Sequence, residues 1–232
     1  MPDRINYDIM AIGAHPDDIE FGCGGILAKM AATGKKVLLV DLTKGEKGTN
    51  GTAEIREQEG YAAAKTIGAE RIFLDFKDCE VYDTYEGRLK LVEVIRTYRP
   101  TLILAPLWKG EMNHPDHLAT GLMARYAFRY ARLAKILPHL PTHQPQGILH
   151  YLYPTIETVD FIMDISEFVE TWKKMMACHA SQHQTHDFST WNLLHAAKLG
   201  HLIGVAYAQG LVEGAPVIID DLMTISKTMR HI

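Results

Sequence analysis

Short apolar runs that alternate with longer segments of helical periodicity are the feature that most restricts how this 232-residue chain can fold. Val37 to Leu42 and Thr101 to Pro106 are rich in branched residues and have the length of buried strands. Each run is followed by a segment long enough for a helix that crosses back to a parallel neighbour. The pattern therefore predicts an α/β fold with a mostly parallel sheet.

The same reading places the individual elements. Strands are predicted at Tyr7 to Gly13, Val37 to Leu42, Arg71 to Phe76, Thr101 to Pro106, Ile148 to Tyr153 and Phe161 to Ile165. Helices are predicted from Gly24-Gly25 to Gly34 and at Thr52 to Ile67, Leu89 to Tyr98, Pro115 to Leu133, Glu167 to His179 and Trp191 to Gln209. Val217 to Met223 is expected as an edge strand or as coil. No repeat or linker interrupts the pattern, so residues 1–232 are predicted to form one domain.

Composition excludes several classes of protein. The 24 Lys and Arg residues are scattered and are outnumbered by 28 Asp and Glu, which argues against a nucleic-acid partner. The three cysteines form no C-x-x-C pair and indicate neither a disulfide framework nor a thiolate zinc site. No apolar run approaches the roughly 20 residues of a membrane helix. Charges at Asp3, Arg4 and Asp8 break the start of the chain, so we expect a cytoplasmic protein with no membrane partner.

Two clusters of histidine and aspartate follow two of the predicted strands. His15-Pro16-Asp17-Asp18 follows the first strand, and His114-Pro115-Asp116-His117 follows Thr101 to Pro106 after a short loop. Because ligands bind at the carboxyl ends of parallel strands, we expect the clusters to converge on one point. Taken alone, either cluster can also be interpreted as an ordinary turn, since Pro and Asp are common in loops for conformational reasons.

Together the clusters contain the residue types of a catalytic metal site. His15, Asp18 and His117 provide two nitrogens and a carboxylate, which leaves an open position for water. Zn²⁺ is the expected ion, although the same ligands suit Fe²⁺ or Co²⁺. Asp17 and His114 remain beside the metal, where one group can take a proton from water and the other can protonate a leaving group.

Five segments extend this interpretation over nearly the whole chain, in order. They are Ala14-His15-Pro16-Asp17-Asp18, Thr49-Asn50-Gly51-Thr52 with Arg56-Glu57-Gln58-Glu59, His114-Pro115-Asp116-His117, Ser181-Gln182 and Gly204-Val205-Ala206-Tyr207-Ala208. This set resembles the LmbE/PIG-L family of zinc-dependent N-deacetylases. Asp-Asp-Ile-Glu-Phe-Gly at 17–22 is similar to the bacillithiol-biosynthesis branch, whereas many other relatives read His-Pro-Asp-Asp-Glu.

The resemblance implies a Rossmann-like, mostly parallel sheet with helices on both faces, and zinc bound by three side chains. Those side chains match His15, Asp18 and His117. Asp17 matches the general base, and His114 matches a group that assists the oxyanion or protonates the leaving amine.

Further positions are implied around that centre. Tyr207, from the late helix, matches a donor to the oxyanion, although a tyrosine among apolar residues is by default a core residue. Arg56 matches a substrate-facing arginine, where a solvated helix face is the default interpretation. Asp116 is expected to orient a ligand histidine. The resemblance also implies a homo-oligomer, such as a hexamer.

These assignments predict a hydrolase that removes the acetyl group from N-acetylglucosaminyl malate in bacillithiol biosynthesis and releases acetate. Lys44 and Lys47, together with Arg56, are expected to supply positive charge for malate. Alternative amino-sugar substrates are an inositol glycoside, a chitooligosaccharide or a thiol conjugate cleaved by amidase action. The alternative from another class is a nucleotide-binding regulatory module, which the carboxylates after the first strand disfavour because they would repel a pyrophosphate.

The remaining histidines carry weaker signals. His179, His183 and His186 resemble a metal tract, yet they lie at a helix end where imidazolium complements the dipole. Six others are expected at the surface or in packing: His139, His143, His150, His195, His201 and His231. Cys23 is expected as a buried structural thiol.

Overall fold

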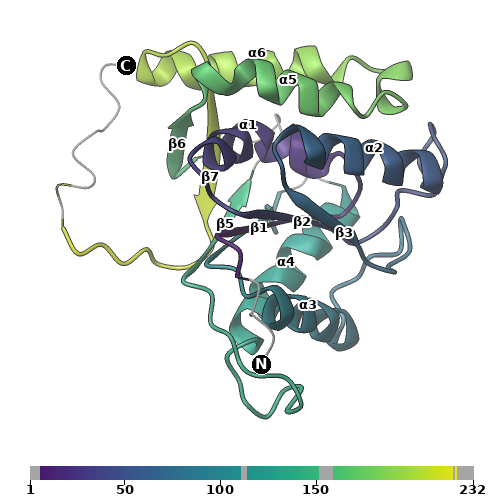
Figure 1. Cartoon of the computed structure of the whole chain (residues 1–232), viewed down its shortest axis with the longest axis vertical. Helices are drawn as coiled ribbons and strands as arrows, with labels where there is room; N and C mark the ends of the chain where they lie inside the picture. Colours follow the sequence, from purple (N-terminus) through teal and green to yellow (C-terminus); the bar gives the residue numbers. More distant parts are fainter. Residues whose placement is uncertain (1–5, 111–113, 152–158, 222, 224–232) are drawn as a thin grey trace.

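A seven-stranded sheet forms the centre of the molecule in the order β3-β2-β1-β4-β5-β7-β6 (Figure 1). The computed structural model describes residues 6–110, 114–151, 159–221 and 223. The strands are β1 Ile9–Gly13, β2 Val37–Asp41, β3 Glu70–Phe73, β4 Leu102–Pro106, β5 Gly147–Tyr151, β6 Phe161–Asp164 and β7 Ala208–Glu213. The first five pair in parallel, and β7 is antiparallel to both β5 and β6. The predicted mostly parallel α/β sheet is confirmed.

Helices cover both faces of this sheet (Figure 1). On one face lie α1 Asp18–Ala32, α2 Ala53–Thr66, α5 Val169–Ala177 and α6 Phe188–Ile203, with 3₁₀ turns at Ser166–Phe168 and Gln182–Gln184. On the other face lie α3 Tyr85–Tyr98 and α4 Pro115–Tyr130. None of the helices in the described part of the chain is long and apolar enough to cross a membrane.

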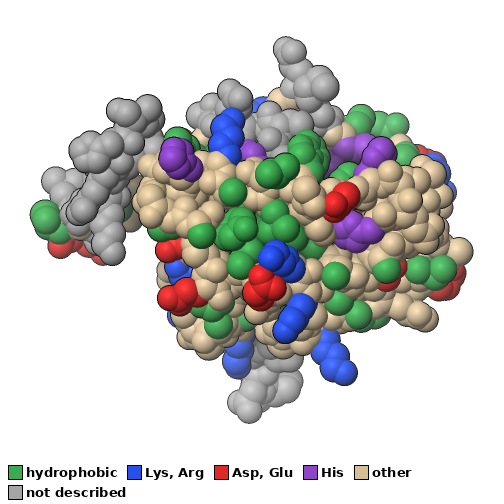
Figure 2. All heavy atoms as spheres, turned by 90° about the horizontal axis from the view of Figure 1, so that it is seen from above, with side chains coloured by type: hydrophobic (Ala, Val, Ile, Leu, Met, Phe, Trp, Pro, Cys, Tyr) green, Lys and Arg blue, Asp and Glu red, His purple; other side chains and the backbone are tan. Residues whose placement is uncertain are grey.

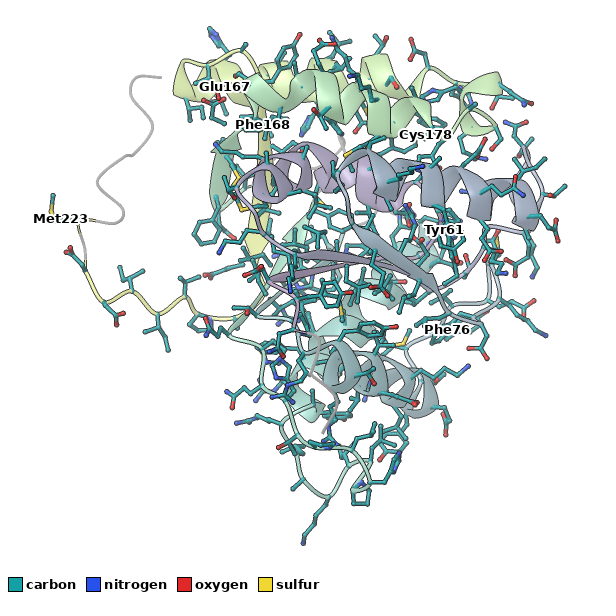
Figure 3. The ribbon with its side chains drawn as sticks, in the orientation of Figure 1. Tyr61, Phe76, Glu167, Phe168, Cys178 and Met223 are labelled. Carbon is teal, nitrogen blue, oxygen red and sulfur yellow. The ribbon has the colours of Figure 1, made fainter. Side chains whose placement is uncertain are left out.

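Two apolar cores fill the spaces between the sheet and its helices (Figure 3). Because side chains alternate along a strand, Met10 and Ile12 of β1 face the core under α3 and α4, whereas Ile9 and Ala11 face the core under α1 and α5. A strand buried on both faces explains why this part of the sequence is continuously apolar rather than alternating.

Several predicted helix boundaries differ from the structure by a few residues, and two of the differences have an identifiable reason. The last helix does not reach Gln209 but ends at Ile203, where Gly204 takes a left-handed conformation with φ of 74°, and the chain then enters β7. The first helix already begins at Asp18, and it has a kink at Cys23, where φ is −146°, directly before the glycines at which its start was predicted. A Cβ atom on Gly22 would lie 2.2 Å from the Tyr151 ring, so this glycine serves close packing inside the helix. Residues 217–221 are coil.

A buried ionic network ties three elements together behind the ends of β1 and β2. The guanidinium of Arg71, on β3, donates to both carboxylate oxygens of Asp41 and donates to Glu20 Oε1 at 2.6 Å. All three side chains have no exposed surface. Burial opposes ionisation of Glu20, but Arg71, followed by His179, lowers its pKa to about 2. The network therefore fixes the first turn of α1 against β2 and β3.

Replacement of Arg71 tests this role. Arg71→Met should lower the free energy of unfolding by about 3–5 kcal/mol, because it leaves buried Asp41 without its cation and buried Glu20 with His179 alone. Urea denaturation followed by circular dichroism measures the change. Arg71→Lys keeps the positive charge but loses the paired guanidinium donors to Asp41, so a smaller loss of stability is expected. Wild-type stability in Arg71→Met would contradict the role given to the network.

Candidate active site

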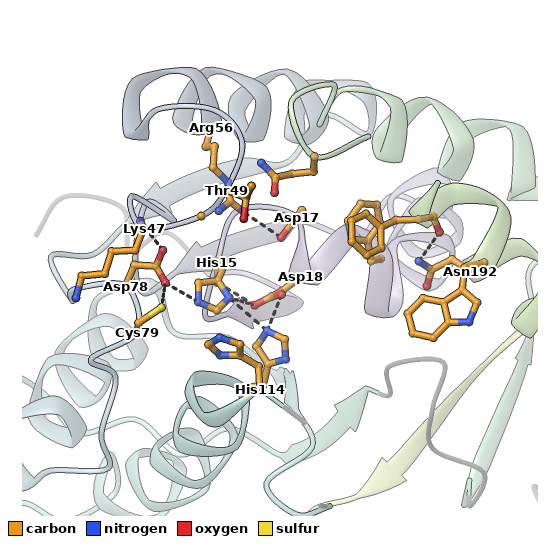
Figure 4. A pocket seen from close by; sticks show the side chains of 16 residues that line it. His15, Asp17, Asp18, Lys47, Thr49, Arg56, Asp78, Cys79, His114 and Asn192 are labelled. Atoms are coloured by element: carbon orange, nitrogen blue, oxygen red, sulfur yellow. Dashed lines mark hydrogen bonds and ion pairs between the residues drawn. The ribbon is translucent and has the colours of Figure 1, made fainter. Parts of the chain in front are cut away.

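The two predicted histidine-aspartate clusters meet at one cavity of about 470 Å³ (Figure 4). His15 and Asp17 follow β1, and Asp18 begins α1. His114 caps α4, and His117 lies in its first turn. β1 and β4 are hydrogen-bonded neighbours, so their carboxyl ends bring the two clusters to the same edge of the sheet.

Three side chains place their ligand atoms at metal-site separations. His15 Nδ1 lies 3.4 Å from Asp18 Oδ2, His117 Nε2 lies 3.0 Å from Asp18 Oδ1, and the two histidine nitrogens are 3.3 Å apart. Ligand atoms at zinc-bond distance from a tetrahedral ion are about 3.3 Å from one another. Two imidazoles and a carboxylate therefore fit a divalent ion here. Ligand atoms of His15, His114 and His117 lie within 4.8 Å of one another, and so do those of His15, Asp78 and Asp116, so His114 competes with Asp18 as the third ligand.

Backbone groups fix the carboxylate of this set. Asp18 Oδ2 accepts the N–H groups of Ala14 and His15 at 2.9 and 2.8 Å. Burial alone would raise the pKa of Asp18, but the imidazoles of His117 and His15 hold it well below its usual range. Asp18 is therefore ionised and held in place before any ion binds.

The outer nitrogen of His15 is shared by two buried carboxylates. His15 Nε2 lies 3.1 Å from Asp78 Oδ1 and 3.2 Å from Asp116 Oδ2. Such partners orient a ligand histidine and raise its basicity. Burial would lower the pKa of His15, but the carboxylates of Asp18, Asp116 and Asp78 outweigh it and raise that pKa to about 12. A metal ion must therefore displace a proton from His15, which makes its affinity pH-dependent.

Asp116 was expected in this orienting role, whereas Asp78 was missed. Two loops hold these carboxylates: in the loop between β3 and α3, Cys79 N–H donates to Asp116 Oδ2 at 2.8 Å, and in the loop between β2 and α2, Lys47 N–H donates to Asp78 Oδ2 at 2.8 Å. Cys79 has a φ of 59°, which is uncommon for a non-glycine residue. Asp78 lies two residues after the predicted strand Arg71 to Phe76, so a search for carboxylates after every strand would have found it.

Asp17 projects from strained backbone next to the three ligand atoms. Its φ is 127°, a conformation that persists only where surrounding structure enforces it. Arg56 provides part of that enforcement: Nη2 lies 3.4 Å from Asp17 Oδ1 and donates to the Pro16 carbonyl at 2.9 Å. Burial raises the pKa of Asp17, and Arg56 opposes part of the rise.

Arg56, expected to face the substrate, lies at the cavity but is largely buried. Its side chain lines the cavity, yet Arg56 is only 5% exposed, and its remaining terminal nitrogen donates to the Gly45 carbonyl at 3.0 Å. Both terminal nitrogens of the guanidinium are therefore engaged by backbone carbonyls and by Asp17, so Arg56 helps to fix the position of Asp17.

His114 is held with one nitrogen turned to the backbone. Its Nδ1 accepts the N–H of Asp116 at 3.2 Å as the cap of α4. Burial, followed by the neighbouring His15 and His117, lowers the pKa of His114. At neutral pH the ring is therefore uncharged, and its proton lies on Nε2, where it can be donated.

The structure does not bring Tyr207 to the cavity. Because the last helix ends at Ile203, Tyr207 precedes β7, where its N–H donates to Ser166 Oγ at 3.0 Å and its carbonyl accepts the N–H of Ile165 at 3.0 Å. Its side chain packs beside the apolar core under α1 and α5, and it is not among the residues that line the cavity.

The tract of later histidines does not form a metal site either. His179 is fully buried against Glu20 Oε2 at 3.2 Å. His183 Nε2 lies 3.2 Å from the Met176 carbonyl. Among the described residues, no group of potential metal ligands includes His179, His183 or His186.

Comparison with known proteins shows the family to which this chain belongs. The family model of PIG-L, GlcNAc-PI de-N-acetylase, matches residues 10–128, just over half of the chain. The chain belongs to this family. All the clustered side chains described above lie inside the matched segment, whereas α6 and Tyr207 lie outside it.

Individual relatives, which match a larger part of the chain than the family model does, support the same family membership. Diacetylchitobiose deacetylase of Thermococcus kodakarensis is 30% identical over 88% of this chain and 81% of its own length. Conserved protein TT1542 of Thermus thermophilus superposes with a TM-score of 0.85 at 33% identity, covering 92% of this chain and 97% of that one. N,N'-diacetylchitobiose deacetylase of Pyrococcus horikoshii superposes with a TM-score of 0.81 at 27% identity. This superposition covers 91% of this chain and 85% of that one. The predicted fold and N-deacetylase class are confirmed.

Substitution of Asp78 tests the shared contact on His15. Asp78→Asn should weaken metal affinity about 10- to 100-fold, because it removes a charged acceptor from a ligand histidine. Competition with a chromophoric chelator measures this without an activity assay. Asp75→Asn is the matched control, since Asp75 is an exposed neighbour in the same loop and pairs with Lys90. Equal affinities in Asp78→Asn and wild type would contradict the contact.

Proposed function

We propose that this PIG-L family member is a zinc-dependent hydrolase that removes the acetyl group from an N-acetylglucosamine conjugate and releases acetate and a free amine. The observation that carries the proposal is Asp17, a buried carboxyl with raised pKa beside three converging ligand atoms at a single cavity. A carboxyl whose pKa lies nearer to neutrality is a better general base than an ordinary aspartate.

The protein side chains divide the remaining work. His15, Asp18 and His117 would hold the zinc, which supplies polarisation of the amide carbonyl and activation of water. Asp17 accepts the proton that water loses as its oxygen bonds to the carbonyl carbon, and returns it to the nitrogen as the C–N bond breaks. His114 Nε2–H is placed to donate to the developing oxyanion, which favours that role over protonation of the amine.

The malate conjugate remains a prediction that rests on motif resemblance. Three cations were expected to supply charge for malate, but Lys44 pairs with Glu57 and Arg56 with Asp17. Lys47 lies on the cavity wall and pairs with Glu80. Exposed ion pairs of this type contribute about 0–1 kcal/mol to stability, so Lys47 can leave Glu80 to pair with a bound anion. Lys47 alone, however, provides one positive charge for the two carboxylates of malate.

A deacetylation assay tests the function. Purified protein should release amine from at least one of a panel of N-acetylglucosaminyl malate, an inositol glycoside, diacetylchitobiose and a thiol conjugate. Activity should be lost with a chelator and restored by zinc. Asp17→Asn should retain zinc and lose about 10²- to 10⁴-fold in kcat, the usual contribution of a general base. Zinc-loaded protein that releases no amine from any conjugate would reject the proposal.

The pH profile of an Arg56 variant tests the base. Because Asp17 must be ionised, kcat/KM should fall as pH decreases through the pKa of Asp17. Arg56 opposes the rise of that pKa, so Arg56→Met should move the acid limb to higher pH. Arg56→Lys keeps a positive charge and should move it less. An acid limb that stays in place, or moves to lower pH, would remove Asp17 from the role of base.

A further inference from the structure

The loop between β2 and α2, residues 43–52, lies directly against the side chain of Arg56. A Cβ atom on Gly45 would lie 1.9 Å from Arg56 Nη1. A Cβ atom on Gly51 would lie 3.2 Å from Arg56 Cγ, and the φ of 77° at this position also favours glycine. Because the backbone of the loop touches the Arg56 side chain, the position of the loop limits where Arg56 can lie. Arg56 in turn contacts Asp17.

The outer side of this loop is hydrogen-bonded to the turn between α5 and α6. Gln182 Nε2 donates to the Asn50 carbonyl at 2.9 Å, and Asn50 Nδ2 donates to Thr185 Oγ1 at 3.0 Å. A Cβ atom on Gly51 would lie 2.8 Å from Ser181 Oγ, so the loop and the turn are in close contact. Two of the segments that carry the family resemblance thus meet here, although neither provides a metal ligand.

Glu59 of α2 holds this turn through Ser181. Glu59 Oε1 accepts the Ser181 N–H, and Glu59 Oε2 accepts the Ser181 hydroxyl, both at 2.7 Å. Ser181 Oγ also accepts Gln182 Nε2 at 2.9 Å. Within the described ranges of the chain, no ion pair involves Glu59. Hydrogen bonds to a carboxylate are roughly twice as strong as those between neutral groups, so this half-buried side chain fixes Ser181 firmly.

The turn lies under the outermost layer of the molecule on this face, which α5 and α6 form (Figure 1). Seen from outside, acidic and basic side chains are scattered over this layer (Figure 2). The attachment to Glu59 comes from the inner side, where α2 packs against α5 and Ser181 is only 4% exposed. Glu59 therefore connects the outer helical layer to the helix that carries Arg56.

These contacts form a closed ring around Arg56. Glu59 lies three residues after Arg56, so the two side chains leave neighbouring positions of α2. From Glu59 the contacts run through Ser181 and the turn to the loop, and from the loop back to Arg56. Asp17, whose φ is 127°, depends on Arg56 to hold its strained conformation. A displacement of the loop is therefore transmitted to Asp17.

We infer that Glu59 is a positioning residue of the active site. By holding the turn, and through the turn the loop at 43–52, it keeps Arg56 against Asp17. The inference rests on the proposed function, because it concerns the side chain proposed as the general base. Displacement of a reacting group by about 1 Å can cost about 10²-fold in rate, so a contact this far from the metal ligands can still affect catalysis.

Substitution of Glu59 tests the inference. Glu59→Ala should lower kcat about 10- to 100-fold and leave zinc affinity unchanged, because Glu59 contacts no metal ligand. Glu59→Gln keeps an acceptor for the Ser181 N–H and should recover most of the loss. Gln58→Ala is the matched control, since Gln58 is exposed on the same helix. Wild-type kcat in Glu59→Ala, or an equal loss in Gln58→Ala, would overturn the inference.

A double variant separates positioning from a general loss of structure. If Glu59 acts through Arg56, adding Glu59→Ala to Arg56→Met should lower kcat further by no more than about 2-fold, the usual error of additivity. Losses that multiply would show that Glu59 acts independently of Arg56, and would overturn the inference. If Glu59→Ala does not fold, Ser181→Ala replaces it in both experiments, with smaller losses expected because the backbone N–H bond to Glu59 remains.

Hydrogen exchange followed by mass spectrometry distinguishes failure of this inference from failure of the proposed function. In Glu59→Ala the hydrogen-bonded amides of Gly45, Lys47 and Gly48 should exchange faster than in wild type, whereas Gln58→Ala should not change them. If wild-type protein deacetylates no conjugate, faster exchange still supports the contacts, and unchanged exchange overturns them. If wild-type protein is active and exchange is unchanged, the proposed function stands and the inference is wrong.

Discussion

The imidazole of His15 is held from both of its nitrogens, and the rest of the site is arranged around that constraint. On one side its Nδ1 faces Asp18 and His117, and on the other its Nε2 is shared by Asp78 and Asp116. Contacts to one ring thus come from the ends of β1, β3 and β4. A small displacement of any of these strand ends would change a ligand separation that is now close to the value for a tetrahedral ion.

This arrangement requires several buried charges and two strained residues. Asp17 and Cys79 have positive φ values of 127° and 59°, and each lies next to a carboxylate that the site needs. Arg56 and Arg71 are both buried: Arg56 contacts the loops after β1 and β2, and Arg71 joins β3 to Asp41 of β2 and Glu20 of α1. Breaking such pairs costs far more than forming them gains, because the remaining charge stays buried without a partner. The network therefore acts chiefly by fixing positions, and the apolar cores on either side of the sheet provide the bulk of the stability.

Sequence reasoning found the parts of the site that depend on local order. The strands before His15 and His114 are continuous apolar runs, and the carboxyl ends of neighbouring parallel strands converge, so these two clusters could be placed together in advance. The burial of Arg56 could not be predicted, because two of its partners are the backbone carbonyls of Pro16 and Gly45, which no side-chain pattern marks. Tyr207 was misplaced because apolar residues continue through Gly204, whose left-handed turn ends the helix.

The most direct measurement is anomalous scattering from crystals of the zinc-loaded protein, recorded on both sides of the zinc absorption edge. The account requires one strong peak about 2.0–2.1 Å from His15 Nδ1, Asp18 and His117 Nε2, with His15 Nε2 still against Asp78 and Asp116. A zinc peak beside His114 in place of Asp18 would show a different ligand set, and His114 could then not donate to the oxyanion. A peak elsewhere in the molecule would contradict the account at its centre.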